Sequence, residues 1–120
     1  MLPEKIALAE KLTLFNGHWS PKSIAAINGQ SLKLVKFQGE FVWHHHEEAD
    51  ELFYVIEGEF TMQFRQGDVV LKAGELIVVP RGVEHCPKAD REVSVLLIEP
   101  QEMRNTGNIE DAKTNAVEAI

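Results

Sequence analysis

The sequence predicts a single all-β domain whose antiparallel strands form a sandwich or a barrel. From residue 28 onward, short runs rich in apolar and β-branched residues alternate with turn signals such as Asn28-Gly29 and Gln66-Gly67. These turns are too short to contain crossover helices, so neighbouring strands are expected to pair antiparallel. A length of 120 residues, 44% of them hydrophobic, suits one domain with its own core.

The N-terminal residues are the exception, because their apolar positions follow helical spacing. Ile6, Ala9 and Leu12 recur at intervals of three, and Pro3 suits a first helical turn, so a short helix is expected over about residues 3–14. The remaining elements are expected to be strands. They are placed at Ile24–Ile27, Ser31–Phe37, Glu40–His46, Leu52–Glu57, Phe60–Arg65, Asp68–Leu71, Leu76–Pro80 and Val93–Glu99.

The last twenty residues have a different character from the barrel. Pro100 ends the last strand, so the domain is expected to cover residues 1–100, and residues 101–120 form a polar C-terminal tail. The simpler interpretation is a partly ordered tail. The alternative is a flap over the barrel mouth, in which Arg104 or Asn105 would touch a ligand.

Composition narrows the range of partners. The formal net charge of −7 argues against binding to nucleic acid or to an anionic membrane. No apolar run approaches the roughly 20 residues of a membrane span, and the N-terminus lacks the apolar core of a secretory signal. We therefore expect a cytoplasmic protein. Cys86 is the only cysteine, which excludes an internal disulfide and a paired-cysteine metal site.

Four residues suggest a metal centre. His44 and His46 are two apart in a predicted strand, so their side chains should leave the same face. Glu51 opens the next strand, and a hairpin would bring its carboxylate beside the two imidazoles. His85 follows a second glycine- and proline-punctuated strand and is a fourth candidate. Three imidazoles and one carboxylate suit one divalent transition metal, for which nickel, zinc, manganese, iron, cobalt and copper remain open.

The same residues resemble the two motifs of the cupin family. The first is Gly39, four residues, His44-x-His46, four residues, Glu51, six residues and Gly58. The second is Gly74, five residues, Pro80-x-Gly82, two residues and His85. The first gap is one residue shorter than is usual, and Ala89 replaces a common terminal asparagine. The resemblance implies a small single-domain cupin, with an antiparallel double-stranded β-helix (a jelly-roll barrel) that holds one metal.

The predicted strand faces suggest a second copy of the chain. If His44, His46 and Glu51 point inward, then Phe41, Trp43 and Tyr54 point outward with Leu52 and Ile56. Such a face is too apolar for a sheet surface that meets water. A homodimer that buries this face is therefore expected, as it also is from the resemblance to small cupins.

The resemblance leaves the chemistry open, because cupins include dioxygenases, isomerases and binding modules. The first hypothesis is a non-haem metal enzyme, dioxygenase-like or a related lyase or isomerase, that acts on a small organic molecule. A non-catalytic, metal-dependent binding cupin is the alternative, since no general acid, base or nucleophile stands out beyond the ligands. A phosphomannose isomerase-like enzyme would need a cationic phosphate clamp, for which only Lys36, Arg65 and Arg81 are candidates.

Overall fold

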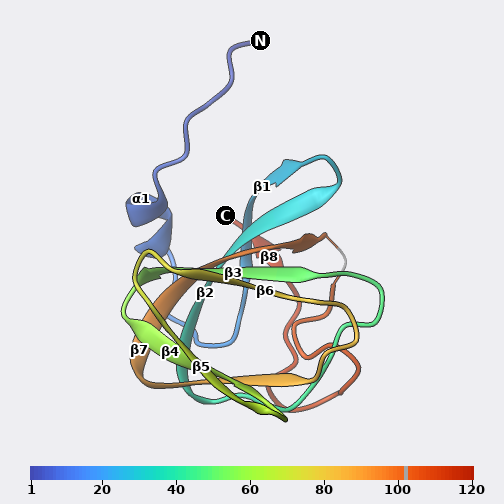
Figure 1. Cartoon of the computed structure of the whole chain (residues 1–120). Helices are drawn as coiled ribbons and strands as arrows, with labels where there is room; N and C mark the ends of the chain where they lie inside the picture. The colour runs from blue at the N-terminus through green and yellow to red at the C-terminus, as the bar shows by residue number, and fades with distance from the viewer. Residues whose placement is uncertain (102) are drawn as a thin grey trace.

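The computed structural model describes residues 1–101 and 103–120, and its regular secondary structure is almost entirely β-strand (Figure 1). The elements are α1 (Leu8–Leu12), β1 (Lys22–Ile27), β2 (Gln30–Glu40), β3 (Glu51–Glu57), β4 (Glu59–Phe64), β5 (Gly67–Lys72), β6 (Leu76–Val79), β7 (His85–Pro100) and β8 (Glu118–Ala119). No helix in the described residues is long and apolar enough to cross a membrane.

The strand β7 organises the barrel because it pairs with three other strands. Residues 88–100 of β7 run antiparallel to β2, its second half pairs with β3, and its first residues pair with β4. The strand β6 pairs with β3, and β5 pairs with β4, so each adds one further strand to the sheet. The predicted antiparallel barrel is therefore confirmed. One departure is the short β8, which pairs parallel to β1.

The interior follows from the alternation of side chains along these strands. Val35, Val95 and Val55 are aligned across β2, β7 and β3, and all three are buried. Aromatic residues fill the barrel between these valines and the site described below, and they belong to the same buried cluster. This inward face is the one predicted for β3, where Glu51, Phe53 and Val55 are buried and the intervening residues are half-exposed.

The predicted strand Glu40–His46 is wrong. The strand β2 ends at Glu40. Its pairing with β7 shifts register between Phe37 and Gly39, and Gly39 has a φ of +83°. Beyond it only His44 forms a bridge, to His85. Because strict alternation is lost, Phe41 and His44 are both buried, so the prediction that Phe41 points outward is wrong too.

Two other boundaries differ from expectation. The strand β7 begins at His85 and not at Val93, so Asp90 and Arg91 lie in an exposed part of this strand. The helix α1 covers only Leu8–Leu12, where residues 3–14 were expected. A short helix that buries no side chain gains little from packing, and the residues before it extend away from the barrel (Figure 1).

Candidate metal centre

The four candidate ligands meet at one end of the barrel. Each offers one donor atom, and these atoms all lie within 4.8 Å of one another. Glu51 opens β3 and His85 opens β7, whereas His44 and His46 lie on the loop between β2 and β3. All four side chains are buried, none being more than 7% exposed. The residues predicted from sequence are therefore brought together.

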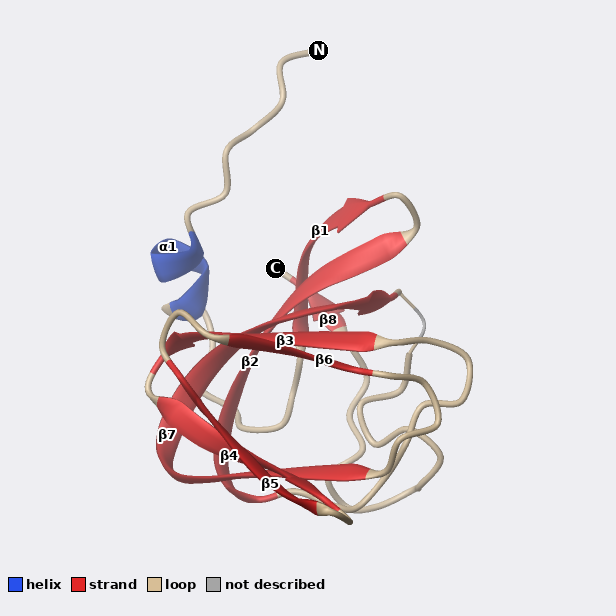
Figure 2. Cartoon of the chain, in the orientation of Figure 1, coloured by secondary structure: helices blue, strands red, loops and turns tan. Residues whose placement is uncertain are grey.

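Backbone hydrogen bonds hold the loop that carries His44 and His46. The amide of His44 donates to the carbonyl of His85 at 3.0 Å, and the reverse bond measures 2.9 Å. The amide of Gly82 donates to the carbonyl of His46 at 2.8 Å. Figure 2 shows this end of the molecule, where the loops gather beside the strand ends. The loop is thus fixed by the second motif, which supplies His85 itself.

Two of the imidazoles have a defined tautomer. Nδ1 of His44 lies 2.8 Å from the carbonyl oxygen of Val42, and Nδ1 of His85 lies 2.9 Å from that of Val83. Because a carbonyl oxygen only accepts, each Nδ1 must carry the proton and donate it. In the neutral imidazole, Nε2 then carries the lone pair. This is the arrangement that orients a metal-ligating histidine.

The donor atoms at the centre of the cluster fit a metal ion. Nε2 of His46, Nε2 of His85 and Oε1 of Glu51 are buried without a hydrogen-bond partner in the described chain. Oε1 of Glu51 lies 3.3 Å from Nε2 of His46 and 3.4 Å from Nε2 of His85. Ligands about 2.0–2.2 Å from a shared metal are separated by roughly 3.0–3.5 Å at tetrahedral or octahedral angles. The cluster is therefore compatible with a divalent metal.

Burial and neighbouring charges set the protonation of the cluster. Burial, followed by the proximity of His85, lowers the pKa of His44 to about 4, so this imidazole is neutral near pH 7. Burial alone would raise the pKa of Glu51, but interactions with Glu99, His46 and His85 outweigh it and hold the pKa well below its usual range. A neutral imidazole at His44 and an ionised carboxylate at Glu51 are the protonation states that metal binding requires of these two groups.

Sequence reasoning missed an ion pair beside the cluster. Nζ of Lys33 donates to Oε1 of Glu99 at 2.9 Å, and the two side chains are 0% and 1% exposed. Burial, followed by the negative charge of Glu51, raises the pKa of Glu99 well above its usual range despite Lys33. A signal was present, since both residues occupy inward positions of predicted strands, between apolar neighbours.

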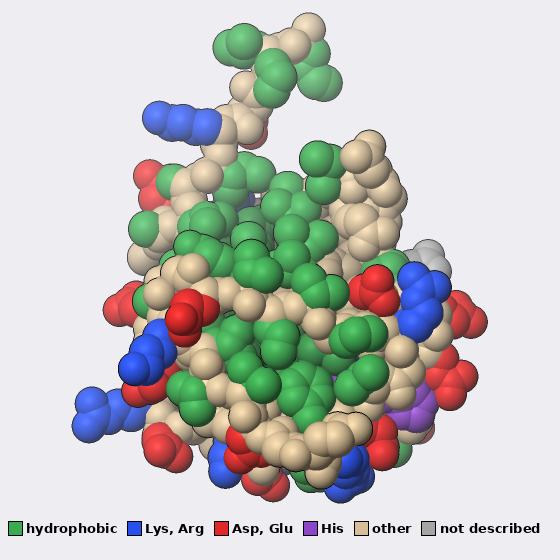
Figure 3. All heavy atoms as spheres, viewed as in Figure 1, with side chains coloured by type: hydrophobic (Ala, Val, Ile, Leu, Met, Phe, Trp, Pro, Cys, Tyr) green, Lys and Arg blue, Asp and Glu red, His purple; other side chains and the backbone are tan. Residues whose placement is uncertain are grey.

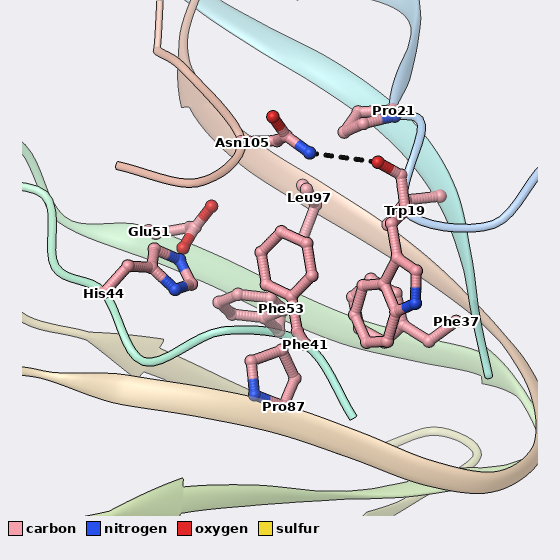
Figure 4. A pocket seen from close by; sticks show the side chains of 11 residues that line it. Trp19, Pro21, Phe37, Phe41, His44, Glu51, Phe53, Pro87, Leu97 and Asn105 are labelled. Atoms are coloured by element: carbon pink, nitrogen blue, oxygen red, sulfur yellow. Dashed lines mark hydrogen bonds between the residues drawn. The ribbon is translucent and has the colours of Figure 1, made fainter. Parts of the chain in front are cut away.

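A narrow apolar cavity reaches the cluster from inside the barrel (Figure 4). The space open to the centre of a water molecule is about 20 Å³, which is room for a water or a molecule the size of dioxygen. Among the lining residues only His44, Glu51 and Asn105 carry polar side chains. The lining residues are Trp19, Pro21, Val35, Phe37, Phe41, His44, Glu51, Phe53, Pro87, Leu97 and Asn105.

Trp19 closes the far side of this cavity. Its ring is stacked between Phe37 and Phe41, with ring centroids 4.5 Å away on each side. Its φ of 58° lies in the left-handed region, which a bulky residue rarely adopts. Such a conformation persists only where surrounding contacts impose it. The connector that carries Trp19, where the sequence suggested no role, therefore forms part of the candidate site.

The C-terminal segment supplies several of these contacts. The carbonyl of Trp19 accepts hydrogen bonds from the side-chain amides of Asn105 and Asn115, each at 3.0 Å. Asn105 lines the cavity, but its amide nitrogen is already engaged with Trp19 and with the carbonyl of Lys113. Arg104 instead bonds the carbonyl of Gly107 and lies outside the cavity lining. This segment thus packs against the cavity wall.

The same segment also contacts the ligand loop. The amide of Asn108 donates to the carbonyl of His45, and its side chain accepts from the amide of His45. Gly107 has a φ of +57°, and a Cβ there would collide with the carbonyl oxygen of His45. Glycine is therefore required at this approach. The side chain of His45 points to Glu47 at 2.9 Å and is not one of the converging donors.

The remaining candidates lie outside the cluster. Cys86 is buried, and burial followed by the charge of Glu40 raises the pKa of its thiol to about 11, which does not favour a reactive thiolate. Lys36 donates to backbone carbonyls near α1. Arg65 stacks on Trp43, and Arg81 pairs with Asp50. None of the three suggested phosphate-binding cations lines the cavity.

Comparisons with known proteins agree with this geometry. A cupin-2 domain protein of Shewanella frigidimarina superimposes with a TM-score of 0.79 at 49% identity, covering 80% of this chain and 94% of that one. The uncharacterized protein YdbB of Bacillus subtilis is 42% identical over 64 residues, which are 52% of this chain and 57% of YdbB. The 3-hydroxyanthranilate 3,4-dioxygenase of Bos taurus is 32% identical over 65 residues.

These comparisons cover different shares of the proteins involved. The bovine match covers 51% of this chain but only 23% of the enzyme, so the chain spans well under two thirds of either curated relative. The profile of the cupin domain matches residues 33–99, which contain both histidine motifs and most of the barrel. Because that match exceeds half of the sequence, the chain belongs to the cupin domain family.

Proposed function

We propose that this cupin binds one divalent transition metal through His44, His46, Glu51 and His85, and that it is a non-haem metal enzyme acting on a small organic molecule. The observation that carries the proposal is the convergence of three buried donor atoms that have no hydrogen-bond partner among the described residues. A buried polar atom without a partner is costly unless something else satisfies it. A metal ion would satisfy all three at once.

Dioxygenase-like chemistry is the reaction class that we favour. A metal bound by imidazoles and one carboxylate supplies a centre at which dioxygen or a chelating substrate can react. The chain's part is to hold the four ligands and to keep bulk water out with aromatic walls. The similarity to 3-hydroxyanthranilate 3,4-dioxygenase over 65 residues supports this class over a lyase or isomerase.

The cavity favours an uncharged ligand. No lysine or arginine of the described chain lines it. Glu51, a candidate metal ligand, is the one acidic residue among the described lining residues. Apart from the proposed metal, a phosphate or carboxylate group would have no cationic partner among the described lining residues. This weighs against a phosphomannose isomerase-like function and against a carboxylated aromatic substrate. Any ligand larger than dioxygen requires side chains such as Trp19 to move.

The C-terminal segment, described in residues 103–120, has a proposed role in closing the cavity. Asn105 and Asn115 bond to the carbonyl of Trp19, and Asn108 bonds to the ligand loop. We propose that this segment is a cover over the site, because it ties the cavity wall to the loop that carries His44 and His46.

The non-catalytic alternative rests on the same cavity. Beyond the metal cluster, the described lining residues offer no acid or base, so a metal-dependent binding module would need nothing further. The two functions differ in whether dioxygen is consumed.

An oxygen electrode separates these two functions. Protein loaded with Fe²⁺ is expected to consume dioxygen in the presence of at least one uncharged catechol or hydroquinone, with much less consumption for carboxylated analogues. The His46→Ala variant controls for free iron. Stoichiometric iron binding without consumption for any compound, with manganese and cobalt giving the same outcome, would favour the binding module.

We further propose that a second copy of the chain covers the outer face of β3 and β6. Leu52 pairs with Val78 and Tyr54 with Leu76, and these outward rows contain no charge. Leu76 is 57% exposed and Val78 is 48% exposed. Figure 3 shows hydrophobic side chains gathered over this face. An uncharged face can pack on itself across a two-fold axis despite the net charge of −7.

The Leu76→Asp variant is expected to shift the protein from dimer to monomer in sedimentation velocity, because two aspartates would face each other in the buried contact. Val70→Asp is the matched control, since Val70 is 53% exposed on β5, outside the paired rows. Wild-type protein that sediments as a monomer at all concentrations would contradict this interface. Trp43, expected on the same face, instead packs against Arg65.

A further inference from the structure

The stability of the protein does not explain why an ion pair is buried inside the barrel. Lys33 and Glu99 are buried together; the inward residues that follow Lys33 along β2, Val35 and Phe37, are apolar, and Ser31 before it is a buried serine. Removing two charges from water costs more than most buried pairs regain, and an apolar pair of similar volume is commonly at least as stable. The surrounding core could therefore be apolar throughout.

The strand register places this pair directly behind the candidate metal ligands. Leu52 of β3 pairs with Ile98 of β7, which puts Glu51 beside Glu99 on the inner face. Ser31 of β2 pairs with Glu99 on the other side, and Lys33 lies two residues farther along β2. A line of charged groups thus runs across three adjacent strands, from Lys33 through Glu99 to Glu51.

The contacts of Glu51 leave Glu99 as its anchor. One carboxylate oxygen of Glu51 faces His46 and His85, 3.3 and 3.4 Å away. Among the described residues no lysine, arginine or backbone amide donates a hydrogen bond to Glu51, and the strand register places Glu99 next to it on the inner face. Glu99 is itself fixed on one oxygen by Lys33, while its Oε2 is buried without a partner.

We propose that Glu99, held by Lys33, is a positioning residue that fixes the Glu51 carboxylate for metal binding. The inference rests on the proposed metal centre. Groups that orient a metal ligand typically contribute about 10- to 100-fold to metal affinity. The lysine contributes by holding Oε1 of Glu99 at 2.9 Å, which fixes the side chain that lies beside Glu51.

The test replaces both charges at once with Lys33→Met/Glu99→Leu, so that neither is left buried alone. The full-length chain is stripped of metal and titrated with Co²⁺ against a competing chelator. We expect the affinity to fall about 10- to 100-fold and the visible Co²⁺ absorption bands to shift, while the melting temperature of the metal-free protein is kept or raised. Wild-type affinity with an unchanged spectrum would overturn the proposal.

Lys36→Met is the matched control. Lys36 is also a buried lysine of β2, but it donates to the carbonyls of Leu12 and Phe15 and not to a carboxylate. It should lower the melting temperature and leave Co²⁺ affinity and spectrum unchanged. An equal loss of affinity in this variant would assign the effect to general destabilisation and refute a specific role for Glu99.

Glu99→Gln keeps the claim testable if the double variant does not fold. It retains the volume and an acceptor oxygen for Lys33, but it replaces the ionisable carboxyl with an amide, so a smaller loss of affinity with a shifted spectrum is expected. Wild-type protein that binds no Co²⁺ would defeat the proposed metal centre itself. Tight binding in the wild type and in Glu99→Gln, with the same spectrum, would defeat only the positioning role.

Discussion

Replacing His46 or Glu51 with alanine is expected to lower the affinity of this cupin for a divalent metal by at least about 100-fold, because each change removes a donor atom outright. Both donor atoms are buried and converge with that of His85. The fold should persist, because the barrel core lies mostly beyond these side chains. Competition titration with Co²⁺ measures the affinity, and far-ultraviolet circular dichroism checks the fold.

The neighbouring His45 provides the control for this pair of variants. It has the same side chain on the same loop, but it bonds to Glu47 and does not join the converging donors. His45→Ala should therefore bind metal within a few-fold of wild type. If His45→Ala and His46→Ala lose metal equally, or if neither does, the assignment of the four ligands is wrong.

Trp19→Ala is expected to destabilise the protein by about 3–5 kcal/mol, the usual cost of emptying a buried aromatic site. The indole is stacked between Phe37 and Phe41, and its Nε1 donates to the carbonyl of Gln38 at 3.1 Å. The change also widens the cavity beside the candidate metal site. Urea denaturation measures the loss of free energy of unfolding.

Trp43 supplies the comparison for this substitution. It is half-buried and stacks under Arg65 at 3.9 Å, so Trp43→Ala should cost about 1–2 kcal/mol. A cost for Trp19→Ala no greater than that for Trp43→Ala would mean that the connector is loosely held and does not close the cavity.

The barrel could be predicted because the sequence signals of its turns and strands involve residues that are close together in the chain. The Asn28-Gly29 turn joins β1 and β2 as expected, with φ values of 51° and 77°. The apolar alternation of β3 correctly placed Leu52, Tyr54 and Ile56 on the outer face, where they are only half-buried. The two glycine- and histidine-containing motifs likewise identified the four residues that meet, since their spacing depends on short turns.

The loop from Phe41 to His46 shows where such signals fail. Its alternating pattern resembles a strand, yet bonds to the distant residue His85 and the left-handed Gly39 determine its path. The burial of Phe41 follows from those contacts and not from local periodicity.

Contacts between distant residues also explain what the sequence could not reveal about the cavity. Trp19 and Asn105 are 86 residues apart, and Lys33 and Glu99 are 66 apart. Each pair depends on strand register and on the path of the C-terminal segment, neither of which a single sequence specifies. A charged residue on a predicted inward face, such as Lys33, is nevertheless a signal that merits attention in other sequences.

The central claim is that His44, His46, Glu51 and His85 hold a metal. The most direct test is elemental analysis of the full chain purified without a histidine tag and without added metal. The account predicts about one equivalent of a first-row transition metal per chain. Protein that carries none, and that takes up none when supplied with iron, manganese, cobalt, nickel, copper or zinc, would contradict it.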